Sequence, residues 1–206
     1  LVKDISNWLK KNYLKKFTQN EIKEEYNSSF KEKFKHKRLH WSSSKTMVNR
    51  YKFIKSLVKF EKFKNWLDIG SGDGSFQKFI VPKFKSIKCD ALEISSKLHK
   101  NSLSKKIIRT NFYLNDFSSF KFKKKYDVIT CHGVLSKTNL NIINFLKISS
   151  KSLSQNGILI FDITNFNWIK FKNRNFFREP SHNWFSVINI KKQIKEIKKL
   201  KILKIH

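Results

Sequence analysis

Apolar positions form two kinds of pattern along the chain. Short and mostly apolar runs predict strands, at residues 66–69, 87–93, 107–114, 126–131 and 158–163. Stretches in which apolar positions recur every three or four residues predict helices, at residues 45–60, 95–104, 141–153 and 189–200, with a further helix after Gly74. Strands that alternate with helices are typical of a mostly parallel sheet covered on both faces. A sixth strand is predicted at 201–205, and no seventh strand can be found.

Three closely spaced glycines separate the first strand from the helix that follows it. The run Trp66–Ile69 stops at Gly70-Ser71-Gly72-Asp73-Gly74. Glycine permits positive φ angles and lets a ligand approach the backbone. The N–H groups that open the next helix favour the electron-rich end of a ligand. The pattern therefore predicts a ligand at the carboxyl end of the first strand, as in doubly wound folds.

The spacing of these glycines differs from the G-x-G-x-x-G fingerprint of dinucleotide-binding proteins. Asp68-Ile69-Gly70-Ser71-Gly72-Asp73-Gly74 instead resembles the first motif of class I S-adenosylmethionine-dependent methyltransferases, an acidic residue followed by G-x-G-x-G. The resemblance implies an α/β fold with a three-layer, doubly wound, mostly parallel sheet, and S-adenosylmethionine as the cofactor. It also implies that the loop wraps the methionine part of the cofactor, with Asp68 near its amino group. The alternative is a glycine turn in another α/β protein.

The same resemblance implies cofactor contacts at the ends of later strands. Glu93, followed by Ile94, would grip the ribose hydroxyls, although a helix-capping carboxylate is the alternative. An acidic residue after the third strand would face the adenine amino group and an apolar neighbour would cover the ring, a description that Asn115, Asp116 and Phe117 fit. Asparagine and aspartate are also ordinary turn residues. After the fourth strand, the implied cofactor contacts are Cys131, His132 and Val134.

Within the family, the chain is similar to small-molecule enzymes such as the ubiquinone-biosynthesis O-methyltransferases. The similarity rests on Leu39-His40, Asn49-Arg50 and the segment 131–135. It implies that Arg50 pairs with the methionine carboxylate of the cofactor. Those enzymes continue with Glu-His, whereas this chain has Ser136-Lys137. The metal or acid–base role of that pair therefore does not carry over, and no metal site is predicted.

Methyl transfer to oxygen or nitrogen often needs a base near the acceptor. His132, at the end of the fourth strand, is the first candidate for this catalytic role, and the alternative is that it contacts the cofactor only through its backbone. His182 is the second candidate and His40 a weaker third. Segment 164–187 is rich in aromatic residues, of which Trp168, Phe177 and Trp184 are expected to form a wall of the acceptor pocket near His132. The alternative is a satellite core without ligand contact.

Composition bears on the partner more than on the fold. The net charge of +30 would suit a polyanion, but only five of the 45 basic residues are arginines, leaving 45 − 5 = 40 lysines spread along the chain. We interpret the lysines mainly as a solvated surface and predict a small-molecule methyl acceptor. The alternatives are an RNA or protein methyltransferase, or a non-catalytic basic RNA-binding module that retains the fold.

Two units are expected: a basic helical extension or lid at residues 1–45, and a cofactor-binding domain at 46–206 with an incomplete sheet edge at its C-terminal end. Cys89 and Cys131 lie in apolar runs, which indicates buried thiols and a reducing, cytoplasmic compartment. No apolar run is long enough to predict a membrane span, and no signal peptide is recognised. The sequence does not decide the oligomeric state.

Overall fold

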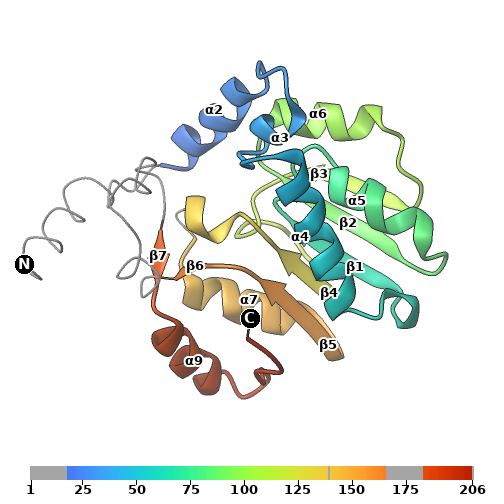
Figure 1. The fold of residues 1–206 in the computed structure, drawn as a ribbon. Helices are drawn as coiled ribbons and strands as arrows, with labels where there is room; N and C mark the ends of the chain where they lie inside the picture. Colours follow the sequence, from blue (N-terminus) through green and yellow to red (C-terminus); the bar gives the residue numbers. More distant parts are fainter. Residues whose placement is uncertain (1–17, 139, 166–182, 206) are drawn as a thin grey trace, which may run out of the picture.

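A parallel sheet forms the centre of the computed structural model, which describes residues 18–138, 140–165 and 183–205 (Figure 1). Its strand order is β3-β2-β1-β4-β5, and every neighbouring pair is parallel. The strands are β1 (Asn65–Ile69), β2 (Lys88–Glu93), β3 (Thr110–Leu114), β4 (Tyr126–Cys131) and β5 (Leu153–Phe161). The chain starts in the middle and winds outward in both directions, so the order reverses between β1 and β4. Ligands of doubly wound sheets bind at this switch point.

Helices cover both faces of the sheet (Figure 1). An apolar core lies between the sheet and the helices on each face. One face is covered by α4 (Ser44–Leu57) and α5 (Ser75–Ile80), the other by α7 (Ile142–Ser152) and α9 (Val187–Glu196). Because successive strand residues point to opposite faces, Trp66 packs in the first core and Leu67 in the second. These observations confirm the predicted three-layer α/β fold.

Local capping chemistry explains where the helices begin. The side chains of Ser43, Ser95, Asn141 and Ser186 accept hydrogen bonds from backbone N–H groups in the first turns of α4, α6 (Ser96–Ser104), α7 and α9. Such caps satisfy donors that have no partner inside the helix. Short 3-10 helices at Phe60–Lys62, Val81–Lys83 and Leu135–Lys137 lie in connections between these elements.

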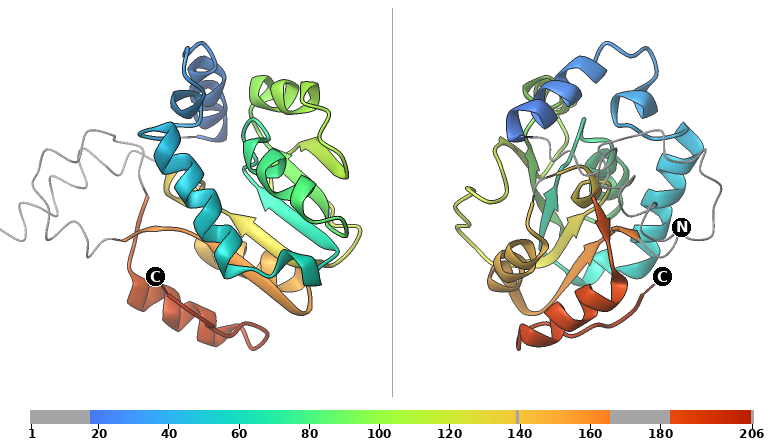
Figure 2. Two further views of the ribbon diagram at one scale, coloured as in Figure 1. Left: turned by 45° about the vertical axis from the view of Figure 1, so that its right-hand side comes forward. Right: turned by 90° about the vertical axis from the view of Figure 1, so that its left-hand side faces the viewer.

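The described part of the N-terminal extension consists of α2 (Gln19–Ser29) and the short α3 (Lys35–Arg38). Thr18 and Glu21 form a capping box at the start of α2. This helix lies against α6 (Figure 2), where Asn27 Oδ1 accepts a hydrogen bond of 2.8 Å from Ser95 Oγ. The extension is thus fastened to the domain next to the loop that follows β2.

Two predicted features of the C-terminal half are wrong. Helix α7 ends at Ser152 and β5 already begins at Leu153, so Asn156-Gly157 lies inside a strand, beside a register irregularity between Tyr126 and Val128. Residues 201–205 form no strand, and Leu203 is 75% exposed. Among the described residues after β5, the only strands are β6 (Thr164–Asn165) and β7 (Trp184–Phe185), which pair with each other. Trp168, Phe177 and His182 lie outside the described residues.

Candidate active site

A cleft of ≈ 2190 Å³ lies at the carboxyl ends of the central strands and continues along β5. This volume exceeds the roughly 300–1,000 Å³ of a typical small-molecule site, because the cleft continues along β5 to α9 and residues 199–205. The part near the switch point is lined by the glycine loop, the ends of β2, β4 and β5, helix α4 and the N-terminal extension. In the same order, these elements contribute Gly70, Ser71 and Gly72; Glu93 and Ile94; His132, Gly133 and Val134; Asp162; Arg50; and Ile22, Tyr26, Leu39 and Trp41.

The glycine loop is held in a conformation that side chains would obstruct. Gly70 has a φ of +74°, and a Cβ atom there would lie 2.2 Å from Val134 Cγ2. Gly72 has a φ of +57°, and a Cβ atom there would lie 2.7 Å from Leu39 Cδ2. The N–H groups of Gly70 and Ser71 both donate to the Leu92 carbonyl at 2.9 Å. The loop is therefore pinned to the end of β2 and open toward the cleft.

Glu93 connects this loop to the start of α6. Its Oε2 atom accepts a hydrogen bond of 2.8 Å from the Gly72 N–H, and its Oε1 atom accepts one of 2.8 Å from the Ser95 N–H. Burial raises the pKa of Glu93 to about 7, although these backbone hydrogen bonds act in the opposite direction. Each carboxylate oxygen retains acceptor capacity toward the cleft. The arrangement fits the ribose-binding role implied by the sequence.

Asp68 lies beneath the loop and does not line the cleft. Its side chain has no exposed surface, and its two carboxylate oxygens accept hydrogen bonds from Gln77 and Thr130. Thr130 in turn accepts a hydrogen bond of 2.8 Å from Trp66 Nε1. Burial raises the pKa of Asp68, opposed by nearby His132 and by the two hydrogen bonds. Asp68 thus joins β1 to β4 and α5, and its carboxylate has no free face toward a ligand.

Asp73 is also buried and does not line the cleft. It accepts a hydrogen bond of 3.1 Å from the Ser75 N–H and forms ion pairs with Lys105 at 2.7 Å and Lys35 at 3.6 Å. Burial alone would raise the pKa of Asp73, but the ion pairs and hydrogen bonds outweigh it and lower that pKa. Since Lys35 belongs to α3, Asp73 fastens the N-terminal extension to the glycine loop.

His132 lies among aromatic rings at the end of β4. Its ring centroid is 4.9 Å from that of Phe76, 5.9 Å from that of Tyr51 and 6.2 Å from that of Trp41. The Nδ1 atom is buried and has no hydrogen-bond partner within the described parts of the chain. His40, the third candidate base, lies in the N-terminal extension, where its Nδ1 is 3.6 Å from Glu25.

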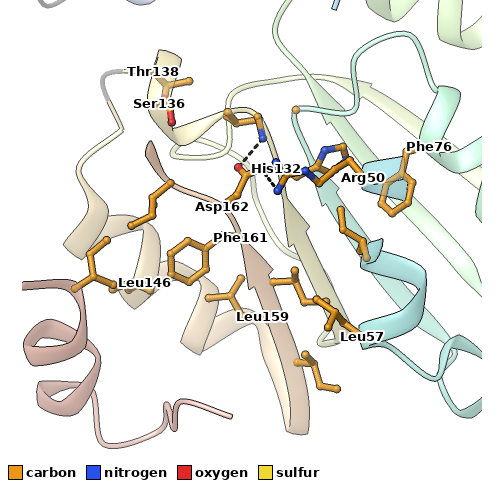
Figure 3. A pocket seen from close by; sticks show the side chains of 18 of the residues that line it. Arg50, Leu57, Phe76, His132, Ser136, Thr138, Leu146, Leu159, Phe161 and Asp162 are labelled. Carbon is orange, nitrogen blue, oxygen red and sulfur yellow. Dashed lines mark hydrogen bonds and ion pairs between the residues drawn. The ribbon is translucent and has the colours of Figure 1, made fainter. Parts of the chain in front are cut away.

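Arg50 and Asp162 meet across the cleft mouth beside His132 (Figure 3). Arg50 Nη1, from α4, lies 3.3 Å from Asp162 Oδ2, which directly follows β5. The other oxygen, Oδ1, accepts a hydrogen bond of 2.7 Å from the Gly133 N–H after β4. The carboxylate therefore joins three elements that are distant in the sequence.

The residues expected near adenine do not line the cleft. Asp116 accepts hydrogen bonds from Ser118 and Gln19, and the Phe117 ring is buried in the second core beside Phe122 and Phe145. Asn115 donates its N–H to the Glu93 carbonyl at 3.0 Å. Cys131 is fully buried, as is Cys89, and burial raises the pKa of both thiols. The cofactor roles assigned to these residues stay predictions.

Sequence reasoning missed several residues of the cleft. Ile22, Tyr26, Trp41 and Asp162 line it, but none was predicted as a ligand contact. Only Asp162 carried a usable signal, because an acidic residue directly after a buried parallel strand lies at the ligand-binding edge of the sheet. Among the described residues, no three His, Cys, Asp or Glu side chains are grouped as metal ligands would be. No described helix is long and apolar enough to cross a membrane.

A family model described as a methyltransferase domain matches residues 34–196. The search of curated proteins found no match.

Solved structures share this architecture. YcgJ from Bacillus subtilis is 17% identical, with a TM-score of 0.61, and the match covers 72% of this chain and 67% of that one. The plantazolicin methyltransferase BpumL, solved in complex with SAH, is 17% identical, with a TM-score of 0.62 and coverage of 86% and 75%. The N-methyltransferase NodS from Bradyrhizobium japonicum is 15% identical, with a TM-score of 0.56 and coverage of 74% and 84%. At these identities the likeness concerns the fold.

Proposed function

The chain belongs to the methyltransferase domain family, and we propose that this S-adenosylmethionine-dependent enzyme methylates an oxygen or nitrogen atom of a small-molecule acceptor. The observation that carries the proposal is the continuous cleft from the glycine loop and Glu93 to His132, beneath residues of the N-terminal extension. A site that is walled in this way suits an acceptor that enters it whole.

The residues at the switch point fit the cofactor. The loop at Gly70 and Gly72 offers a backbone surface that a Cβ atom would obstruct, and Glu93 offers carboxylate oxygens for the ribose hydroxyls. Arg50 offers a cation for the methionine carboxylate. When bound, the cofactor supplies a methyl group on a positively charged sulfur. The chain's own contribution is to orient both reactants and to exclude water.

His132 would act as the base that removes a proton from the acceptor. Because Nδ1 is buried, the proton would go to Nε2. The rings of Phe76, Tyr51 and Trp41 surround the imidazole and fix its orientation. A neutral imidazole is the form that can accept a proton.

A small acceptor is favoured over a macromolecule by the cover of the cleft. Ile22, Tyr26, Leu39 and Trp41 line the cleft from the side of the N-terminal extension. The extension is held by the contacts of Asn27 with Ser95 and of Lys35 with Asp73. A nucleic-acid strand or a folded protein would require this cover to move.

The test is a transfer assay with methyl-labelled cofactor against three substrate pools: a metabolite extract, total RNA and a protein extract. We expect label in the metabolite fraction with the wild-type protein and none with Glu93→Ala. Label confined to RNA or to protein would contradict the small-molecule acceptor. Absence of label in all three pools, together with salt-resistant binding to one RNA, would indicate the non-catalytic RNA-binding module.

A further inference from the structure

We propose that Asp162 forms, together with Arg50, the site for the charged amino-acid end of the cofactor, with the Asp162 carboxylate taking the ammonium group. This inference rests on the proposed function. It differs from the expectation carried by the sequence motif, which assigns the amino group to Asp68.

A comparison of the acidic residues in and below the cleft favours Asp162 as the partner of the ammonium group. Among the described residues, Glu93 and Asp162 are the acidic side chains that line the cleft. Both oxygens of Glu93 already accept backbone hydrogen bonds beside the loop after β2. Asp68 has no exposed surface, and its oxygens are occupied by Gln77 and Thr130. In a chain with a net charge of +30, Asp162 is thus the accessible anion near Arg50.

The geometry of the pair matches a zwitterion. An α-amino acid carries its ammonium and its carboxylate on one carbon atom, so its binding site needs an anion and a cation side by side. Arg50 Nη1 and Asp162 Oδ2 are 3.3 Å apart, and both side chains are partly exposed in the cleft, at 39% and 26% (Figure 3).

Two hydrogen bonds to the backbone after β4 and at its last residue hold Asp162 in position. The Gly133 N–H donates to Oδ1 at 2.7 Å, and the Asp162 N–H donates to the Cys131 carbonyl at 3.3 Å. These bonds hold the carboxylate at the end of β4 while Oδ2 faces Arg50. Partly exposed ion pairs are weak, so the pair can admit a ligand between its charges at little cost.

A competing role for Asp162 predicts the opposite sign. If Asp162 only neutralises Arg50 in the free protein, it competes with the ligand carboxylate, and its removal would tighten binding. If Asp162 binds the ammonium, its removal weakens binding. Affinity measurements with ligands that do or do not carry the amino-acid end distinguish the two.

The experiment is calorimetric titration with two probes. S-adenosylhomocysteine carries the zwitterionic end, whereas 5′-methylthioadenosine has the same adenosine thioether without it. The proteins are the wild type, Asp162→Asn, Arg50→Gln and the control Glu61→Gln, which removes one negative charge at an exposed position outside the cleft. The amide introduced by Asp162→Asn keeps an oxygen that can accept the Gly133 N–H.

We expect Asp162→Asn to weaken S-adenosylhomocysteine binding roughly tenfold to a hundredfold, as loss of one charged hydrogen bond does. Methylthioadenosine binding should be unchanged, and Glu61→Gln should bind both probes as the wild type does. Unchanged or tighter S-adenosylhomocysteine binding by Asp162→Asn would overturn the inference, as would equal losses for both probes. Failure of the wild type to bind either probe would instead overturn the proposed function.

Discussion

Glu93 links cofactor affinity to pH. Burial raises its pKa to about 7 from an ordinary value of 4.5. Above pH 7 the ionised carboxylate accepts hydrogen bonds strongly, and below it the added proton removes part of that capacity. We therefore expect S-adenosylhomocysteine affinity to fall as the pH is lowered through 7. Calorimetry across this pH range should show that Glu93→Gln binds S-adenosylhomocysteine more weakly, with an affinity that depends less on pH. If Glu93→Gln keeps the wild-type pH dependence, the role of Glu93 in binding the cofactor is contradicted.

The stability of the free protein should respond to Glu93 in the opposite direction. The folded state holds the Glu93 proton up to about pH 7, whereas the unfolded state releases it near 4.5. Ionisation of Glu93 therefore destabilises the fold as the pH rises between these values, and the penalty is absent below the unfolded pKa. Melting curves over the same range should show Glu93→Gln gaining stability relative to the wild type at higher pH.

A substitution at His132 distinguishes a chemical role of its side chain from a contribution of its backbone alone. If its ring takes the proton of the acceptor, His132→Gln should lower kcat by roughly 10²- to 10⁴-fold and leave S-adenosylhomocysteine affinity unchanged. His99→Gln, in α6 outside the cleft, is the matched control. Unchanged turnover in His132→Gln would mean that His132 contributes only through its backbone.

Individual residues of the cleft could be predicted from the sequence where they belong to the glycine motif or lie at a typical distance from it along the chain. Gly70, Gly72 and Glu93 were placed because strand, turn and spacing are local properties. Trp41 could not be predicted, because its neighbour His132 comes from a distant part of the chain. The position of Asp162 after a strand was a usable signal, but its pairing with Arg50 was not visible, because the two residues are far apart in the sequence. The burial of Asp68 was also unpredictable, since its partner Thr130 lies on another strand.

At the scale of secondary-structure elements, the close packing of the turn between β1 and α5 can be tested by comparing alanine at Gly70, in this turn, with alanine at Gly133, after β4. Alanine at position 70 combines a φ of +74° with a Cβ atom 2.2 Å from Val134, whereas at position 133 the φ is +72° and the nearest atom, of Trp41, is 3.8 Å away. We expect Gly133→Ala to cost about 1–2 kcal/mol of unfolding free energy through its backbone alone. Gly70→Ala should cost about 2–5 kcal/mol, because overpacking adds to that strain. Equal losses in urea unfolding would contradict the close packing of Val134.

The five strands of the sheet were predictable as elements because each is a compact apolar run between turn signals. The errors involve strand pairing. Asn156-Gly157 resembles a turn locally, yet it continues β5 beside Tyr126. Residues 201–205 mix lysine with apolar side chains as a strand can, but a strand also needs a hydrogen-bonding neighbour, which a local pattern cannot reveal.

For the molecule as a whole, the docking of the N-terminal extension should control ligand exchange. Asn27 is buried and its side-chain oxygen lies 2.8 Å from Ser95 Oγ and 3.4 Å from the Lys97 N atom. Asn27→Ala leaves these donors without that acceptor, which costs about 1–3 kcal/mol. We expect faster proteolysis within residues 18–40 and faster S-adenosylhomocysteine release. Asn20→Ala, on the exposed side of α2, should behave as the wild type; equal behaviour of both variants would show that Asn27 does not fasten the extension.

The central claim is that the cleft at the β1 switch point binds S-adenosylmethionine and its product. The most direct measurement is calorimetry of S-adenosylhomocysteine against the wild type and Gly72→Arg, with NADH as the comparison ligand and circular dichroism to verify folding. Any side chain at Gly72 would meet Leu39 at a position with a φ of +57°. We predict micromolar binding by the wild type, none by folded Gly72→Arg, and none of NADH. Equal binding by both proteins, or a preference for NADH, would contradict the claim.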